Sequence, residues 1–490
     1  MNKEKKVLSL LKKIIKNTEY ENNIYLVGGA VRDNIMGKDI KDLDFTVIGG
    51  GLDRGIEFST WLAKKMGNYK EGSNPVTFEQ FGTSKLDTKG NTLGIPEIEL
   101  EFVAPRKEEY EEGSRKPIVK AGTLEDEAYR RDLTLNSLMM NVSNEEIIDI
   151  TGRGIDDIKN GIIRTPLDAN VTFKDDPLRM LRAIRFYSKY GFKLEQEVID
   201  GIKNNAERID TISKERVKDE LNKILVTDKP REAMRLMKDV GLLQYIIPEF
   251  KDAIGMTQNK HHKDDVFDHS LEVLSKTQPV LVERLMALFH DIGKVLTKTV
   301  DEGGEVHFYG HEKVGEDMVK DIMRRLKYPN ELIDAVSNGV RHHMNLKHGG
   351  NAAKFTDKTL RKFRQKVGDN LEAILNVIHA DNIAHSEFSS MPDQISKVRE
   401  RLSNLEDKVD ENNNIVLPIN GGDLIKLGLK PSVLVGKILE EVKEMYFENP
   451  NITKEDGMGK AKEIIKQLIS EIGEETFIKK YVKKGFDFII

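Results

Sequence analysis

The sequence predicts an α+β protein in which a small mixed sheet with its helices is followed by an all-helical body. Short runs with strand-like patterning occur within about the first 150 of the 490 residues, and helical periodicity covers almost all the rest. The length suits about three domains at ~150 residues each. All 11 histidines lie between His261 and His385, which marks one helical stretch as chemically distinct.

The composition is that of a globular protein without thiol chemistry. Hydrophobic residues make up 38% and charged residues 32%. The chain has no cysteine, which excludes disulfides, thiolate zinc sites and a cysteine nucleophile, so any metal must bind carboxylates and imidazoles. A net charge of −5 indicates no general basic field, so a nucleic-acid partner would need local patches.

No membrane partner is expected. The most apolar run, 281–289, is interrupted by Glu283 and Arg284 and is far shorter than the ~20 residues of a membrane-spanning helix. The lysine-rich N-terminus has five apolar residues at helical spacing and no signal-peptide pattern: Val7, Leu8, Leu11, Ile14 and Ile15. We therefore expect an amphipathic first helix and a cytoplasmic location.

The strand and helix predictions follow the chain in order. Residues 24–27 and 43–48 read as strands, 98–103 alternates apolar and acidic side chains as a half-buried strand does, and 147–150 could close the sheet. We expect residues 82–96, rich in Gly, Thr and Pro, to form a connection. Helical segments follow at about 175–225, across the histidine region 261–385, and through the last hundred residues.

The segment IYLVGGAVRD places Gly28 and Gly29 between a strand and a helix. Backbone amides at such a turn can approach a phosphate closely, and Arg32 lies one helical turn further on. Alone, this pattern is more often only a tight turn.

Two acids follow in the segment KDLDF. Asp42 and Asp44, two residues apart on a strand, would share one face and suit two Mg²⁺ ions about 4 Å apart on a triphosphate. Glu101 on another strand is the expected third acid. The alternative is a solvated strand edge, which the apolar Leu43 and Phe45 on the opposite face disfavour.

Four segments together resemble a known family. In order they are LVGGAVRDNIMGKDIKDLDF, GTLEDEAYRRDLTLNSLMMN, DDPLRMLRAIRFYSKYGF and SKERVKDELNKIL. They are similar to the successive motifs of the class II tRNA nucleotidyltransferases and bacterial poly(A) polymerases of the DNA polymerase β superfamily. The resemblance covers about 225 residues and departs from the family pattern at Leu133, usually Phe, and at Asp175–Asp176, usually Glu-Asp.

The resemblance implies a polymerase-β-like nucleotidyltransferase head and a helical neck that selects the nucleotide. The implied roles are contact with the triphosphate for Gly29 and Arg32, metal binding for Asp42 and Asp44, and contact with the nucleotide's ribose or phosphate for Arg131, with Asp132 beside it.

Asp176 and Arg179 lie three residues apart at the start of a predicted helix, beginning at Pro177, and would form an acceptor beside a fork of donors. Such a pair matches the amino group and ring nitrogen of cytosine and adenine and is mismatched against uracil and guanine. The alternative is an ion pair at the helix start. The resemblance assigns this pair, with Arg182, to base selection.

The histidine region carries a second resemblance, to the HD-domain metal phosphohydrolases, through the His-Asp doublet of LFHDIGK. It implies that His269, His290, Asp291 and Asp381 hold one divalent metal, and that Asp291 bridges to a second metal on His311 and His343, or His342. Imidazole with carboxylate suits a transition metal such as Mn²⁺ or Ni²⁺. The remaining histidines are expected to be satisfied on helix surfaces: His261, His262, His307, His348, His379 and His385.

These features divide the chain into a head (1–150), a neck (151–240) that also binds RNA, an HD domain (241–395) and a helical tail (396–490). The basic run 351–366 is expected to be a solvated helix face, with a tRNA phosphate patch as the alternative.

We therefore expect an enzyme that adds C and A to tRNA 3′ ends from CTP and ATP, with Mg²⁺ in the head and a possible phosphohydrolase activity in the HD domain. Tail addition by a poly(A) polymerase, or addition of CC or A alone, stays open. A hydrolase whose head only binds RNA and a non-catalytic RNA-binding module are disfavoured. No DNA partner is expected.

Overall fold

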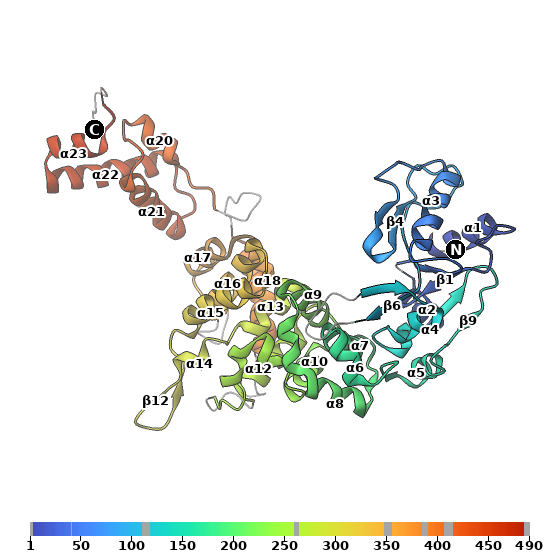
Figure 1. The fold of residues 1–490 in the computed structure, drawn as a ribbon. Coiled ribbons are helices and arrows are strands. Elements are labelled where there is room, and N and C mark those ends of the chain that lie inside the picture. The colour runs from blue at the N-terminus through green and yellow to red at the C-terminus, as the bar shows by residue number, and fades with distance from the viewer. Residues whose placement is uncertain are drawn as a thin grey trace. The chain divides into compact units, whose positions relative to one another are not determined.

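The computed structural model describes residues 3–40, 42–109, 118–258, 264–346, 355–384, 391–405 and 415–484 (Figure 1). The chain divides into two compact units. Unit 1 comprises residues 1–251 with 325–327, and unit 2 comprises 252–324 with 328–490. Within the described ranges, every helix is too short or too polar to cross a membrane.

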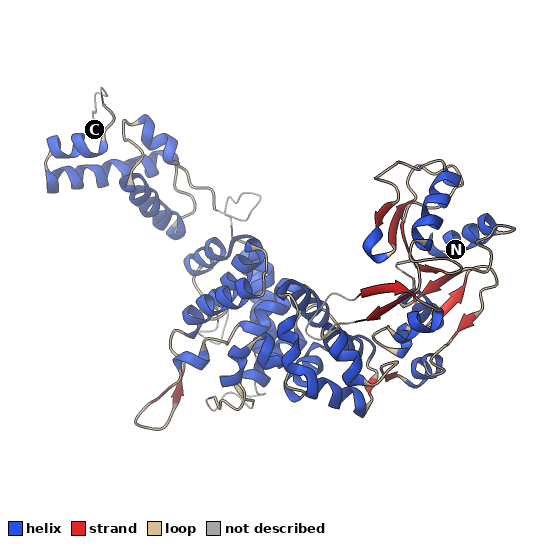
Figure 2. Cartoon of the chain, in the orientation of Figure 1, coloured by secondary structure: helices blue, strands red, loops and turns tan. Residues whose placement is uncertain are grey.

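Unit 1 begins with the expected mixed sheet, whose strands lie almost entirely in the N-terminal part of the chain (Figure 2). The strand order is β3-β4-β5-β2-β1-β8-β9. The strands are β1 (Ile24–Val27), β2 (Asp44–Val47), β3 (Val76–Phe78), β4 (Thr83–Asp87), β5 (Glu99–Val103), β8 (Met139–Asn141) and β9 (Ile147–Ile148). A separate hairpin pairs β6 (Arg106–Glu109) with β7 (Ile118–Ala121).

The sheet brings two acidic residues of neighbouring strands together. Strand β2 runs antiparallel to β1 and parallel to β5, and the β2–β5 register pairs Asp44 with Glu101. On the other face, Phe45 stacks on Phe102 at 5.1 Å, and both are fully buried. This apolar face is covered by α3 (Arg54–Met66), whose Phe58 packs edge-on against Phe102. The alternation of buried and accessible residues thus leaves the acids on the side away from the core.

Helices complete unit 1. They are α1 (Lys3–Ile15), α2 (Gly29–Ile35), α4 (Leu124–Tyr129), α5 (Gly154–Asn160), α6 (Ala169–Asp175), α7 (Leu178–Tyr190), α8 (Gln196–Asn205), α9 (Lys214–Leu225), α10 (Pro230–Asp239) and α11 (Leu243–Ile246). The first is the expected amphipathic helix, with Val7, Leu11 and Ile15 buried. A short parallel pair, β10 (Ile162–Ile163) with β11 (Lys193–Leu194), lies among them.

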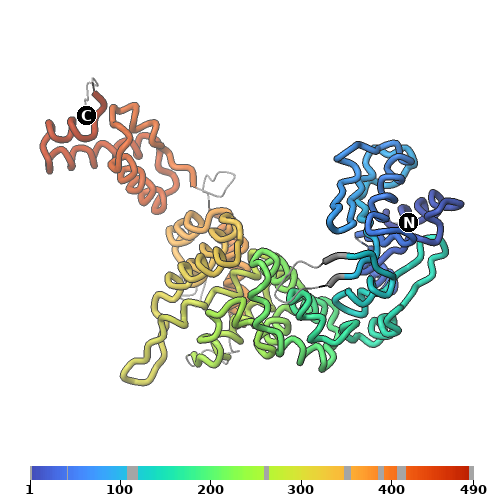
Figure 3. Tube along the Cα trace, in the orientation of Figure 1, coloured from blue at the N-terminus to red at the C-terminus, as the bar shows by residue number. Residues whose placement is uncertain are grey.

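Unit 2 is helical apart from the hairpin of β12 (Thr299–Val300) and β13 (Val306–His307). Its helices are α12 (Val266–Lys276), α13 (Leu281–Phe289), α14 (Lys294–Thr297), α15 (His311–Arg325), α16 (Asn330–His342), α17 (Asp357–Val367), α18 (Leu371–Ala384), α19 (Gln394–Ser403), α20 (Gly421–Lys426), α21 (Val433–Glu448), α22 (Lys454–Ile472) and α23 (Glu474–Tyr481). The green-to-red part of the trace follows this succession (Figure 3). Helix α13 packs against α12, α16 and α18 and forms the centre of the histidine region.

The α+β class is confirmed, and two local predictions are wrong. Residues 82–96 are not only a connection, because 83–87 form β4 and pair with β5 along five residues. Leu86 and Leu100 are fully buried across this pair, so tertiary packing makes a strand of a Gly- and Thr-rich segment. Strand β2 begins at Asp44, so Asp42 precedes the strand instead of lying on it.

Candidate functional site

A cavity of about 530 Å³ in unit 1 collects the head and neck residues singled out in the sequence. Its lining includes Gly28, Gly29, Arg32, Asp42, Asp44, Arg131, Asp132, Asp176, Arg179 and Arg182. Glu101 lines a neighbouring cavity that shares Asp44. The cavity is the size expected for a small-molecule site, and most of its lining is polar or charged.

Glycine at position 28 leaves room for the side chain of Arg131. Gly28 has φ +70°, and a Cβ there would lie 3.0 Å from a guanidinium nitrogen of Arg131. Glycine at this position therefore permits both the backbone conformation and the close approach. Arg32 is 6% exposed, and its guanidinium donates to Asn136 and Asp33. These bonds hold a cation beside the turn, and Asn136 is a member of the site that no sequence signal singled out.

The head carboxylates repel one another in the absence of a cation. Desolvation by the surrounding protein, followed by repulsion from Glu101, raises the pKa of Asp44. Lys85 offsets part of this charge, at 3.8 Å from Glu101. The three acids do not form one tight cluster: the groups of His, Asp and Glu in the described ranges whose ligand atoms lie within 4.8 Å do not include Asp42, Asp44 and Glu101 together.

An ion pair between the head and the neck forms another part of the cavity lining. Asp132 is buried and forms an ion pair of 2.7 Å with Arg182. Burial alone would raise the pKa of Asp132, but Arg182 and the hydrogen bond from Asn136 lower it below its usual value, so the carboxylate stays ionised.

Asp176 and Arg179 reach the same cavity but do not pair as a helix-starting ion pair would. One carboxylate oxygen of Asp176 accepts from the backbone N–H of Leu178 at the start of α7, and the other pairs at 3.0 Å with Arg216, which lies 40 residues further along the chain. Arg179 donates instead to the carbonyl oxygens of Arg130 and Thr172. Arg216 thus belongs to the site, and only tertiary structure could reveal it.

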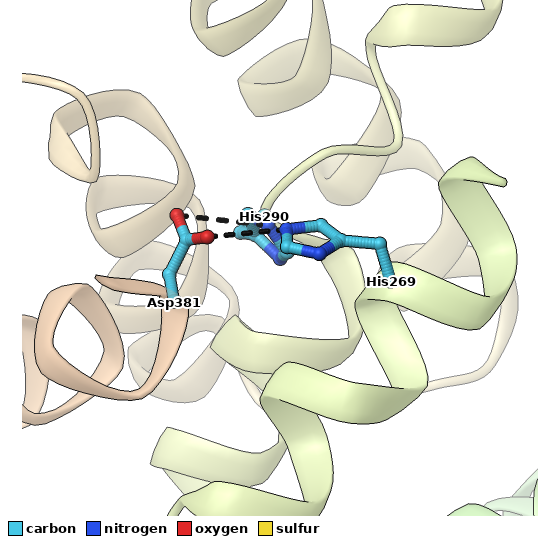
Figure 4. Close-up of side chains that lie close together, drawn as sticks. All are labelled: His269, His290 and Asp381. Carbon is cyan, nitrogen blue, oxygen red and sulfur yellow. Dashed lines mark hydrogen bonds and ion pairs between the residues drawn. The ribbon is translucent and has the colours of Figure 1, made fainter. Parts of the chain in front are cut away.

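Unit 2 contains a second cluster, made by six buried side chains. His269 of α12, His290 after α13 and Asp381 of α18 form one group of ligand atoms, and Asp291, His311 and His343 form another. His269 Nε2 lies 3.1 Å and His290 Nε2 lies 3.9 Å from the Asp381 carboxylate (Figure 4).

Asp291 lies between the two groups. One of its oxygens is 3.1 Å from His290 Nε2, and the other is 3.3 Å from His311 Nε2 and 3.7 Å from His343 Nε2. This is the arrangement expected for a bridging carboxylate. His342 is not part of either group; its ring contacts Asn345.

Backbone carbonyls orient three of the imidazoles. Nδ1 of His290, His311 and His343 lies 2.7 to 2.8 Å from the carbonyl oxygen three residues earlier in each case. A carbonyl oxygen only accepts, so each Nδ1 carries the proton and each Nε2 presents a lone pair to the cluster. His311 Nε2 and His343 Nε2 then face each other at 3.3 Å, an arrangement that a cation between them would stabilise.

The protonation states also fit a metal. Burial lowers the pKa of His343 to about 4 and lowers that of His269, so both rings are neutral at pH 7. Burial would raise the pKa of Asp291, but His290 and Lys294 hold it well below its usual range. Lys294 Nζ donates at 2.7 Å to Asp291 and also to Gln258. Neutral imidazoles and ionised carboxylates are the forms that bind divalent metals.

A cavity of about 500 Å³ opens beside this cluster. His311 lines it together with Tyr309, Lys362 and Lys366. Of the histidines expected on surfaces, His307 pairs with Asp301 on the β12–β13 hairpin, where with Glu305 it forms an accessible third group. His261, His262, His348 and His385 lie outside the described residues.

Comparisons with known proteins agree with this geometry. Residues 24–164 match the poly A polymerase head domain, 191–254 match the probable RNA and SrmB-binding site of polymerase A, and 266–384 match the HD domain. A protein of Neisseria gonorrhoeae called multifunctional CCA protein is 30% identical over 368 residues, which cover 73% of this chain and 83% of that protein. The chain belongs to the CCA tRNA nucleotidyltransferase family.

Other members of the CCA tRNA nucleotidyltransferase family match over more of the chain. The mitochondrial CCA tRNA nucleotidyltransferase of Saccharomyces cerevisiae is 28% identical, with 92% of this chain and 91% of that protein covered. The CCA-adding enzyme of Bacillus stearothermophilus, solved in complex with CTP, superposes with a TM-score of 0.64 at 21% identity, covering 96% of this chain and 100% of that one. A Thermotoga maritima CCA-adding enzyme complexed with tRNA gives a TM-score of 0.58 at 19% identity, covering 96% and 99%. At these identities the superpositions establish the fold.

Proposed function

We propose that this enzyme adds C and A to the 3′ end of tRNA from CTP and ATP, without a nucleic-acid template. The observation that supports the proposal most directly is a single cavity lined by the glycine turn, by two acids at the start of a strand and by an acceptor beside a donor. The family relatives whose names specify CCA addition support the choice of RNA and nucleotides.

In this proposal the residues divide into three roles. Asp42, Asp44 and Glu101 would hold Mg²⁺, which supplies activation of the acceptor hydroxyl and neutralisation of the leaving pyrophosphate. Arg32 and Arg131 hold the triphosphate at the glycine turn. Asp176 accepts from the amino group of cytosine or adenine, while Arg179 donates to the ring nitrogen, and Arg182 holds Asp132 in place beside them.

The test is single-nucleotide incorporation into tRNA ending before C, after the first C and after the second C. The wild type should use CTP on the first two acceptors and ATP on the third, and reject UTP and GTP. The double variant Asp42→Ala and Asp44→Ala should be inactive with a normal melting curve. Repeated addition of A to RNA without a tRNA fold would instead assign the chain to the poly(A) polymerases. A product that stops at CC, or addition of A only to tRNA that already ends in CC, would assign the chain a partial activity.

We propose a second, metal-dependent phosphohydrolase activity for the histidine cluster, directed at phosphoesters of nucleotides or RNA ends. The support is the set of six buried ligands whose lone pairs converge, with Asp291 between the two groups. A divalent transition metal such as Mn²⁺ or Ni²⁺ would supply activated water there. Lys294 and the lysines of the adjoining cavity place positive charge where a phosphate would enter.

Hydrolysis of 2′,3′-cyclic AMP, measured with Mn²⁺, Ni²⁺, Co²⁺ or Mg²⁺, tests this activity. The double variant His290→Ala and Asp291→Ala should lose it and keep nucleotide addition, because the two sites share no residue. A wild type inactive with every metal would contradict the assignment. We also propose a cytoplasmic location, which cell fractionation tests.

A further inference from the structure

The head carries a second cavity, of about 350 Å³, whose aromatic side chains have no role in nucleotide binding as described above. It shares Asp44, Arg130 and Arg131 with the nucleotide cavity. The rest of its lining includes Phe78, Phe81, Glu101 and Arg106. The shared Asp44 makes the two cavities continuous with one catalytic centre.

Two of these side chains are aromatic and open to solvent. Phe78 at the end of β3 is 44% exposed, and Phe81 in the following 3-10 turn is 47% exposed. Fully packed aromatic rings elsewhere in the head, such as Phe45 and Phe102, are below 1% exposed. Two accessible rings beside a charged centre are therefore a binding surface for a flat apolar group, which a nucleobase provides.

The order of the strands indicates from which side of β2 each substrate reaches the catalytic acids. Strand β1, which leads into the Gly28 turn, lies on one side of β2, whereas β5, β4 and β3 lie successively on the other. Asp44 and Glu101 thus stand between the phosphate turn and the two phenylalanines. In phosphoryl transfer the attacking and leaving oxygens lie roughly in line on opposite sides of phosphorus. With pyrophosphate leaving toward the turn, the attacking hydroxyl must enter from the side of β5, β4 and β3.

Positive charge at this side fits an RNA strand. A guanidinium nitrogen of Arg106 donates to the carbonyl oxygen of Phe81 at 3.3 Å, which places the cation at the edge of the aromatic surface. Arg130 and Arg131 line the same cavity, where both pair with the buried Glu127. A cation such as Arg106 beside exposed aromatic rings is the combination that binds single-stranded nucleic acid.

We infer that Phe78, Phe81 and Arg106 form the subsite for the 3′-terminal nucleotide of the acceptor RNA. The rings stack on its base, Arg106 faces its backbone phosphate, and its 3′-hydroxyl reaches the carboxylates of Asp44 and Glu101. This subsite rests on the proposed nucleotide addition and deepens it by assigning the side of the sheet from which the acceptor enters.

Acceptor kinetics on the full chain test the subsite. Phe78→Ala and Phe81→Ala should each raise the KM for tRNA, or lower kcat/KM for it, by roughly 5- to 150-fold, the equivalent of one lost base–aromatic stack. The KM for CTP and ATP should change less than about twofold, because neither phenylalanine lines the nucleotide cavity. Phe81→Tyr should restore acceptor use.

Val76→Ala is the matched control. Val76 lies on the same strand as Phe78 and is 43% exposed, but it does not line the cavity, so its removal should leave both KM values unchanged. Direct binding of a 3′-labelled acceptor gives a readout independent of turnover. For Arg106→Gln, the slope of log Kd against log salt should fall by about 0.7 for one lost phosphate contact, and Arg106→Lys should keep it.

The outcomes distinguish a failure of the proposed subsite from a failure of the proposed function. If the wild type adds C and A while the phenylalanine variants retain wild-type acceptor KM and binding, the subsite assignment is wrong and the proposed function stands. If the wild type adds no nucleotide to any acceptor, the proposed function fails, and unchanged acceptor binding in the variants would then overturn the subsite as well. Melting curves of all variants identify any loss of fold.

Discussion

The carboxylate of Asp176 uses its two oxygens differently, and a single substitution can separate its two roles. One oxygen accepts from the backbone N–H of Leu178, as a cap does, and the other pairs with Arg216. Asparagine retains the capping acceptor but loses the negative charge and can also present an amino group. Capping and base reading are therefore distinguishable by Asp176→Asn.

We expect Asp176→Asn to melt close to the wild-type temperature and to lose discrimination against UTP and GTP. Loss of a hydrogen bond to a charged group, ~1.5 to 3 kcal/mol, corresponds to a fall of roughly 10- to 150-fold in the specificity ratio. Incorporation assays with all four triphosphates measure it. Asp176→Ala should show the same relaxed preference plus a stability loss of about 1 kcal/mol from the missing cap. Unchanged preference in both variants would move base selection to another neck residue.

The raised pKa of Asp44 predicts that a bound metal increases the stability of the folded protein. The pKa of Asp44 is raised in the folded protein, so its ionisation opposes folding: the penalty grows as pH rises from the usual pKa of an aspartate to the raised one, and it is fully present above that. Asp44→Asn should therefore raise the melting temperature of the metal-free protein at pH 7. Adding Mg²⁺ with CTP should stabilise the wild type more than the variant. Thermal-shift measurements with and without Mg²⁺ check both predicted changes in melting temperature. An equal Mg²⁺-induced rise in the wild type and the variant would remove Asp44 from the metal site.

At the scale of one element, helix α17 corrects the prediction of a solvated basic face. Arg361 and Arg364 are 6% and 8% exposed and donate to the carbonyl oxygens of Phe447 and Leu402. Its half-buried lysines instead pair with α21: Lys358 with Glu448, and Lys362 with Glu444, both at 2.6 Å. The helix is thus basic on its packed side as well as on its open side. Residues 351–354 of the basic run lie outside the described residues.

Arg364→Ala should destabilise unit 2 by about 1.5 to 3 kcal/mol, because a buried charge-assisted hydrogen bond to Leu402 is lost. Lys366→Ala, an exposed position on the same helix, should change stability by less than about 0.5 kcal/mol. Lys366 lines the cavity beside the histidine cluster, so its substitution should act on phosphoester hydrolysis instead. Urea unfolding followed by circular dichroism compares the two variants. Equal destabilisation by both would contradict the division of roles along α17.

At the scale of the whole molecule, two sites in two units should respond to different ligands. The nucleotide cavity lies within unit 1, and the histidine cluster lies within unit 2. A metal at a free concentration of 1,000 times its Kd stabilises the folded unit that binds it by about 4 kcal/mol. In calorimetry, a transition-metal chelator should lower one transition, and CTP with Mg²⁺ should raise the other. Both transitions moving together with either ligand would contradict independent sites.

The sequence predicts most where spacing along the chain decides the geometry. The glycine turn, the Asp42 and Asp44 spacing and the His290–Asp291 doublet are local patterns, and the structure brings each to a cavity or cluster. Partners supplied from far along the chain were missed: Arg216 for Asp176, and Asn136 for Arg32. Strand β4 was missed because its stability comes from pairing with β5, and the buried arginines of α17 because charge alone does not reveal burial.

The carbonyls that orient the histidines belong to the residues three places before them, at or next to helix ends. His290 directly follows α13, His343 directly follows α16, and His311 begins α15. Helix ends fray before helix centres on heating. Each imidazole should therefore lose its fixed tautomer while the apolar interior of unit 2 is still intact. Warming should release bound metal, and with it hydrolysis, several degrees below the temperature at which unit 2 melts. Asp44 and Glu101 lie on paired strands and should keep their positions until unit 1 unfolds.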